Sequence, residues 1–144
     1  MKKFFLFILL LLISMCMFSS ESYNIPKIWI VFSSDHSQET IGIGSDVDEK
    51  AAVDKSLFNC GAECKVIKSV KEPDNTVLIV FSSNDIMVSQ IFESNKYNFD
   101  KKTSYTNNLL RKCNKMGGKD CYIVFDSKTF YYNSEEFKDY LSTQ

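Results

Sequence analysis

Cysteine is the residue type with the strongest chemical potential in this chain of 144 residues, which contains five cysteines. Cys60, Cys64, Cys113 and Cys121 stand in two pairs, and an even number of cysteines in an exported chain is typical of disulfides. Zinc is the alternative, but the two unequal spacings fit the short, regular spacing of zinc ligands poorly. We therefore predict disulfides here, with no metal site and no cofactor.

Serine, aspartate and histidine, the residue types of a nucleophilic triad, occur together at Ser33, Ser34, Asp35 and His36. A triad needs three side chains that converge from separate points of the chain. Neighbours at the end of a strand point in alternating directions and cannot converge in this way. The four residues therefore predict a polar hairpin loop, and we expect no catalytic residue among them.

Carboxylates gather at two predicted helix starts, and paired carboxylates can perform acid–base catalysis when burial separates their pKa values. Negative side chains at a helix start also complement the helix dipole, which favours a solvated face over an acid–base site. The residues are Asp46, Asp48, Glu49 and Asp54 on one helix and Glu135, Glu136 and Asp139 on the other.

Tyrosines near the carboxyl end of the chain are the candidate contact residues. Because tyrosine is enriched where proteins meet, Tyr131, Tyr132 and Tyr140 predict a half-exposed aromatic surface for an unknown protein partner. The same residues also fit a terminal strand and a helix that close the core, and this is the interpretation that the sequence favours. The formal net charge of −1 gives no strong positive field, so we exclude nucleic acid as a partner.

Export is the expectation from the first residues of the chain. Two lysines precede the apolar run at residues 4–13, and small polar residues follow it, which is the pattern of a secretory signal peptide. The run is about half of the roughly 20 apolar residues that a membrane-spanning helix needs, so a retained anchor is the weaker alternative. We predict a signal peptide at residues 1–22, a mature domain at residues 23–144 and no membrane span in that domain.

Lipidation is a second alternative at the amino end. Cys16 follows an apolar stretch in the way that a lipobox cysteine does, but Met15 stands where a lipobox has a small residue. We expect Cys16 to be one more apolar residue of the signal peptide.

The chain contains an internal repeat, at about residues 28–70 and 77–125. Ile30 to Asp35 and Ile79 to Asn84 have nearly the same sequence, and each is followed by a helix-like segment that ends in a cysteine. The offset between the copies is 49 residues at the strand and 57 at the last cysteine, as expected for a duplicated unit with loop insertions.

Each copy of the repeat predicts a strand, a hairpin partner, a helix and a further strand. Runs rich in β-branched and aromatic residues at 28–32 and 77–81 predict buried strands, with hairpin partners at 40–43 and 87–91. Ser45 with Asp48 predicts the start of a helix that ends near residue 59, and Asn133 with Glu136 predicts the start of the last helix. The second repeat helix is expected at residues 104–115. The expected buried face of the first helix carries Val47, Ala51, Val53, Leu57 and Phe58.

These elements predict the fold class α+β: a single domain of two similar strand-strand-helix-strand halves, with antiparallel hairpins packed on helices. In each half one cysteine ends the helix and the other opens the next strand. The repeat therefore predicts the pairs Cys60–Cys64 and Cys113–Cys121. Each disulfide is expected to stabilise the domain by about 2–4 kcal/mol, with less from the shorter loop.

At these residues the chain resembles the small secreted bacterial proteins described as domain of unknown function 4189. The resemblance covers about residues 28–125 and rests on a Leu-x-x-Cys helix end, a glycine turn and a Cys-x-Val strand start, given twice. The matching residues are Ala51, Ala52, Leu57, Cys60, Gly61, Cys64 and Val66, and then Leu110, Cys113, Gly117, Gly118, Cys121 and Ile123. The family's further cysteine near Val77 and its tryptophan-rich hairpin are absent. The resemblance implies no catalytic residue.

Three function classes follow from these features. The main expectation is a non-catalytic binding protein, secreted or in the periplasm or cell envelope, and an inhibitor or immunity-type protein for an exported enzyme is one form of it. An enzyme with an unrecognised site and a structural envelope protein are the alternatives.

Overall fold

The computed structural model describes residues 25–93 and 99–143, so the predicted signal peptide and Cys16 lie outside the described residues. The strands are β1 (Ile28–Ser34), β2 (Ile41–Asp46), β3 (Lys65–Glu72), β4 (Asn75–Phe81), β5 (Met87–Glu93) and β6 (Tyr122–Asp126). The helices are α2 (Glu49–Cys60), a short 3₁₀ helix η1 (Phe99–Lys101), α3 (Lys102–Lys115), α4 (Ser127–Asn133) and α5 (Glu135–Ser142).

The strands form two three-stranded antiparallel sheets with the orders β2-β1-β3 and β5-β4-β6. In both sheets the first strand of the half lies in the centre, its hairpin partner lies on one side and the strand after the helix lies on the other. The predicted α+β fold of two similar halves is therefore confirmed.

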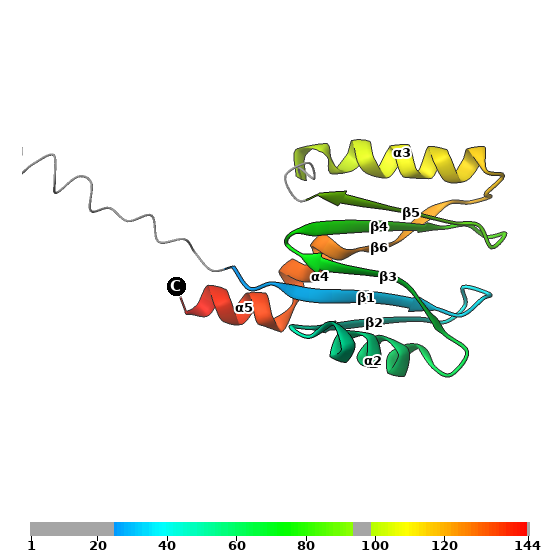
Figure 1. Ribbon diagram of the computed structural model, residues 1–144. Coiled ribbons are helices and arrows are strands. Elements are labelled where there is room, and N and C mark those ends of the chain that lie inside the picture. Colours follow the sequence, from blue (N-terminus) through cyan, green and yellow to red (C-terminus); the bar gives the residue numbers. More distant parts are fainter. Residues whose placement is uncertain (1–24, 94–98, 144) are drawn as a thin grey trace, which may run out of the picture.

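The two sheets pack against each other, and the long helices cover their outer faces (Figure 1). Alternate residues of the central strands point inward, as the two-residue period of a strand requires. Phe32 of β1 and Phe81 of β4 meet there with ring centroids 6.0 Å apart. The other residues of each central strand point outward, toward the helices. In β4 these are Leu78 and Val80, which pack with Leu109 of α3.

The helix α2 lies very close to its sheet. A Cβ atom on Gly42 would lie 2.1 Å from the Ser56 carbonyl oxygen, and one on Gly44 would lie 2.1 Å from the Ala52 carbonyl oxygen. Only small side chains fit such an interface, so the buried residues of α2 are Ala52, Ser56 and Cys60. The predicted buried face is therefore wrong. Phe58 is 88% exposed, and Val47 is 68% exposed and precedes the helix. Ala51, Val53 and Leu57 are only partly buried.

Three further predictions need correction near the helix ends. Asp48 caps α2 through its side chain, while Ser45 lies in β2. Ser134, one residue after the predicted Asn133, caps α5 by accepting a hydrogen bond from the Phe137 backbone N–H. Residues 130–132 belong to α4 rather than to a terminal strand, because the Asp126 side chain caps a helix at Ser127–Asn133.

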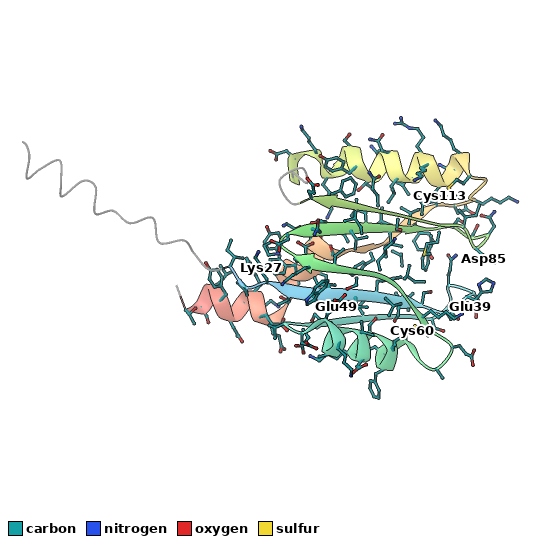
Figure 2. All side chains as sticks on the ribbon, in the orientation of Figure 1. Lys27, Glu39, Glu49, Cys60, Asp85 and Cys113 are labelled. Carbon is teal, nitrogen blue, oxygen red and sulfur yellow. A yellow bond between two sulfur atoms is a disulfide. The ribbon has the colours of Figure 1, made fainter. Side chains whose placement is uncertain are left out.

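The two predicted disulfides are confirmed. Cys60–Cys64 and Cys113–Cys121 each join the end of a long helix to the start of the following strand. Figure 2 labels Cys60 and Cys113, which lie at the same end of the molecule as the two hairpin loops. The opposite end carries α4, α5 and the carboxyl terminus (Figure 1).

Candidate binding groove

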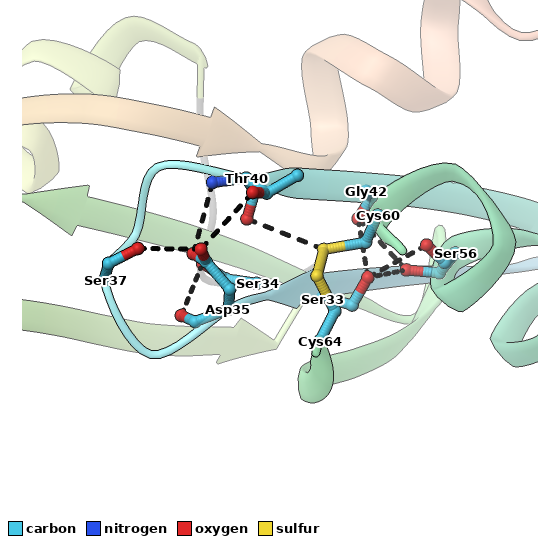
Figure 3. Close-up of a disulfide and its surroundings, with 9 residues drawn as sticks. All are labelled: Ser33, Ser34, Asp35, Ser37, Thr40, Gly42, Ser56, Cys60 and Cys64. Carbon is cyan, nitrogen blue, oxygen red and sulfur yellow. Dashed lines mark hydrogen bonds between the residues drawn. A yellow bond between two sulfur atoms is a disulfide. The ribbon is translucent and has the colours of Figure 1, made fainter. Parts of the chain in front are cut away.

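The serines at the end of β1 and the aspartate that follows them serve structural roles (Figure 3). The Ser33 hydroxyl is buried and donates to the Ser56 carbonyl oxygen at 2.9 Å, which ties β1 to α2. The Asp35 carboxylate accepts hydrogen bonds from the Ser37 hydroxyl at 2.7 Å and from the Thr40 backbone N–H at 3.1 Å. The Ser37 bond is the main reason that the pKa of Asp35 is lowered. The predicted polar hairpin loop therefore holds for Asp35 and His36 and is wrong for Ser33 and Ser34, which are buried residues of β1.

The three predicted contact tyrosines lie in different surroundings. Tyr131 is only 1% exposed, and its hydroxyl donates to the Pro26 carbonyl oxygen at 2.7 Å. Burial raises the pKa of this hydroxyl to about 12. Tyr131 therefore belongs to the core and cannot contribute to a contact surface, which corrects the prediction. Tyr132 is 39% exposed and Tyr140 is half-buried, and the Phe137 ring lies 5.0 Å from Tyr132 and 6.2 Å from Tyr140.

A buried ionic network joins β3, β4 and α4. The fully buried Glu72 carboxylate accepts a hydrogen bond from the Ser127 hydroxyl at 2.7 Å and lies 3.4 Å from the Lys128 ammonium. The Ser127 oxygen accepts in turn from the Val77 backbone N–H at 2.8 Å. Burial raises the pKa of Glu72, and the Ser127 bond and the Lys128 charge oppose that shift.

A carboxyl group with a raised pKa is a candidate for acid–base catalysis, because it can hold a proton near neutral pH. Glu72 and Ser127 have no solvent-exposed surface, and Lys128 is 6% exposed. A substrate in solution cannot reach this carboxyl group in the folded protein. The network therefore fixes α4 against the two sheets.

A groove of about 800 Å³ lies between α2 and the segment formed by α4 and α5. Strand β2 contributes to its lining together with these helices, so the groove depends on residues that are far apart in the sequence. Its apolar side chains are Ile43, Phe58 and Phe130. Its other lining residues are Gly44, Ser45, Asp54, Lys55, Asn59, Asn133, Ser134, Glu135 and Glu136.

The groove has an excess of negative charge. The Lys55 ammonium lies 2.7 Å from the Asp46 carboxylate, and that hydrogen bond is the main reason that the pKa of Lys55 is raised. Asp54 pairs with Lys50 at 3.0 Å across one turn of α2. Glu135 and Glu136 form no salt bridge with residues 25–93 or 99–143, so their two charges exceed those that are paired in the groove.

Side chains of α2 close the outer edge of β2 beside the groove. The Asn59 amide donates to the Ile43 carbonyl oxygen at 2.8 Å, and the Lys55 ammonium donates to the Ser45 carbonyl oxygen at 3.1 Å. A free strand edge offers such carbonyls to a partner strand. Here they are already bonded, so the groove presents side chains to a ligand.

Smaller cavities lie elsewhere on the molecule, and two of them border residues discussed above. One, of about 600 Å³, is lined by both hairpin loops, with Asp35, His36 and Asp85 among its residues. The other, of about 500 Å³, lies on the α3 side of α4 and shares Phe130 and Asn133 with the groove. Within the described residues, no group of three or more histidine, cysteine, aspartate or glutamate side chains could hold a metal ion.

Sequence reasoning missed Phe58, Ile43 and Phe130 as residues of one site. A usable signal was present in β2, because glycines in the interior of a strand often mark a close backbone approach. Gly42 and Gly44 could have indicated that α2 packs through small residues and leaves Phe58 outside.

Comparison with models of known families, with curated proteins and with solved structures finds no match. In the part of the chain that the structure describes, no helix has both the length and the apolar character needed to cross a bilayer.

Proposed function

We propose that this chain is an exported, non-catalytic binding module that holds a protein partner at the groove between α2 and α4–α5. The observation that carries the proposal is Phe58, an aromatic ring that is 88% exposed on a regular helix at the wall of a groove. Aromatic side chains dominate interface energetics because each buries about 150–250 Å². At roughly 25 cal/mol per Å² of buried apolar surface, such a ring can contribute several kcal/mol to binding.

The electrostatics of the groove support binding over catalysis. An acid–base catalyst needs a pKa close to the working pH, which calls for a raised carboxyl pKa or a lowered amine pKa. In the groove the pKa of Lys55 is raised by its hydrogen bond with Asp46, so this amine stays charged. The carboxyl group with a raised pKa, Glu72, lies in the buried network away from the groove. An enzyme with an unrecognised site and a structural envelope protein are the alternative functions.

The expected place of action is outside the cytoplasm, in the secreted, periplasmic or cell-envelope fraction. The two disulfides support this proposal, because disulfides persist in oxidising compartments. The apolar run near the amino end supports it as well. One form of the proposal is an inhibitor or immunity-type protein for an exported enzyme. Membership of the domain of unknown function 4189 stays a prediction and would be compatible with it.

Replacement of Phe58 by alanine is expected to reduce capture of the partner strongly. The mature protein, residues 23–144, is immobilised and incubated with the secreted and envelope fractions of its source. Wild type is expected to retain one protein in stoichiometric amount, and Phe58→Ala at least about tenfold less, because aromatic anchors often contribute 2 kcal/mol or more.

Tyr122→Ala is the matched control, since Tyr122 is an aromatic residue that is 52% exposed on β6, outside the groove. This variant should capture as much as wild type. Recovery of no stoichiometric protein at any salt concentration, or equal recovery by Phe58→Ala, would overturn the proposed function.

A further inference from the structure

We infer that the groove selects a basic and apolar segment of its partner: a protruding loop or helix in which lysine or arginine flanks one large apolar side chain. The inference rests on the proposed function and adds the chemistry of the ligand. It follows from three properties of the groove: its apolar walls, its unbalanced charge and the closed edge of β2.

The apolar walls require an apolar group on the ligand. Ile43, Phe58 and Phe130 come from β2, α2 and α4, so one inserted side chain can contact three elements of the fold. Phe58 has almost no cover from this chain. A large apolar or aromatic side chain is the group that removes most of this surface from water.

The unbalanced charge requires a positive group beside the apolar one. Lys50 neutralises Asp54 and Asp46 neutralises Lys55, which leaves Glu135 and Glu136 as the excess charge of the rim. Glu136 also contributes to the raised pKa of Lys55, so its field reaches across the groove to α2. Lysine and arginine are the side chains that complement such a rim, and an acidic ligand would be repelled.

The bonded carbonyls at the edge of β2 disfavour recognition by strand addition. Strand addition gains its affinity from free main-chain groups at a sheet edge. At this edge Asn59 and Lys55 already bond the outward carbonyls of Ile43 and Ser45. The ligand must therefore be read through its side chains, which a protruding loop or a helix presents well.

Three synthetic peptides labelled with the same fluorophore test the inference directly. One carries Lys-Lys-Phe-Lys-Lys, the second replaces the lysines by glutamates, and the third replaces the phenylalanine by alanine. Fluorescence anisotropy with the mature protein at low salt is expected to give at least tenfold tighter binding for the first peptide than for either of the others. This binding should weaken as salt is added, because the ion pairs at the rim are solvent-exposed.

The variant Glu135→Gln/Glu136→Gln is expected to reduce the preference for the lysine peptide over the glutamate peptide by about tenfold. The control Glu39→Gln/Glu63→Gln removes the same charge from exposed residues at the hairpin-loop end and should leave the preference unchanged. Phe58→Ala should bind the first peptide more weakly than wild type does. Its affinity for that peptide should be close to the affinity of wild type for the alanine peptide.

Failure of this inference can be separated from failure of the proposed function. Three results would overturn the inference that the ligand is basic and apolar. They are equal binding of the lysine and glutamate peptides, an unchanged preference in Glu135→Gln/Glu136→Gln, and no binding of any peptide. The proposed function stands in each case if Phe58→Ala still loses the captured partner. If Phe58→Ala captures that partner as well as wild type does, the proposed function and this inference both fall.

Discussion

Replacement of Lys128 by methionine is expected to lower the free energy of unfolding by about 3–5 kcal/mol at neutral pH, because it leaves a buried carboxylate without its cation. Glu72 is fully buried and lies 3.4 Å from the Lys128 ammonium. Methionine fills a similar volume, so the loss reports the charge rather than a cavity. Urea unfolding with the disulfides intact measures the difference.

The effect of Lys128→Met should depend on pH in a defined direction. Burial raises the folded-state pKa of Glu72 above its usual value of 4.5, so the folded state binds the proton more tightly than the unfolded state. The tighter binding of this proton stabilises the folded state. The stabilisation is fully present below the usual pKa of Glu72 and is lost as the pH rises through the raised folded-state pKa. Without Lys128 the folded-state pKa rises further, and the loss measured at about pH 7 should exceed the loss at about pH 5.

The double variant Glu72→Gln/Lys128→Met is the control for this result. It removes both charges, and buried ion pairs can often be replaced by uncharged groups with little loss. Most of the lost stability should return. An equal loss for Lys128→Met at both pH values, or a double variant as unstable as the single one, would contradict the role assigned to the pair.

Gly44→Ala is expected to destabilise the protein by about 3 kcal/mol or more, at the upper end of the cost of overpacking. The added Cβ would lie 2.1 Å from the Ala52 carbonyl oxygen and 2.5 Å from the Ser56 backbone nitrogen. Both atoms belong to the backbone of α2, so no side-chain rotation relieves the clash and the helix itself must move. Replacement of glycine by alanine at an unstrained site stabilises a protein by about 0.4–1 kcal/mol, so the expected sign is reversed here.

The matched control for Gly44→Ala is Gln90→Ala on β5, the hairpin partner of the second half. Gln90 is exposed, and its replacement should change stability by no more than about 0.5 kcal/mol. Urea unfolding measures both variants. A free energy of unfolding for Gly44→Ala equal to or higher than that of wild type would refute the close approach of α2 to β2.

Most of the fold could be predicted from the repeat. Two β-branched and aromatic runs indicated the central strands β1 and β4, and the cysteines after each helix indicated the pairs Cys60–Cys64 and Cys113–Cys121. These signals are local, because a hairpin and a short disulfide loop join residues that are near in sequence. Periodicity and spacing are sufficient for contacts of this kind.

The carboxyl-terminal segment could not be predicted in the same way. Residues 130–132 are aromatic and suit a strand, and Ser127–Asn133 becomes a helix because Asp126 caps it and Glu72 binds its first residues. The buried partner of Lys128 is 56 residues away in the sequence. Tertiary contacts of this range outweigh local propensity and leave no periodic signal.

The binding groove could not be predicted because it depends on a difference between two similar halves. In the second half α3 packs through the large side chain Leu109, whereas α2 packs through Ala52 and Ser56 over two glycines. This closer packing leaves Phe58 on the outside, and α4 and α5 then form the opposite wall. The sequence shows that Phe58 is apolar, but the short distance between α2 and β2 decides that it faces solvent.

A photo-cross-link from position 58 tests the groove as the partner-binding surface most directly. Phe58 is replaced by the photoreactive aromatic amino acid benzoylphenylalanine in the full chain produced by its own source, and Tyr122 is replaced in the same way as the control. After illumination of intact cells, we expect position 58 to be cross-linked to one discrete protein. We expect no cross-link between position 122 and that protein. A groove that binds no partner would give no product from position 58, or the same products from both positions.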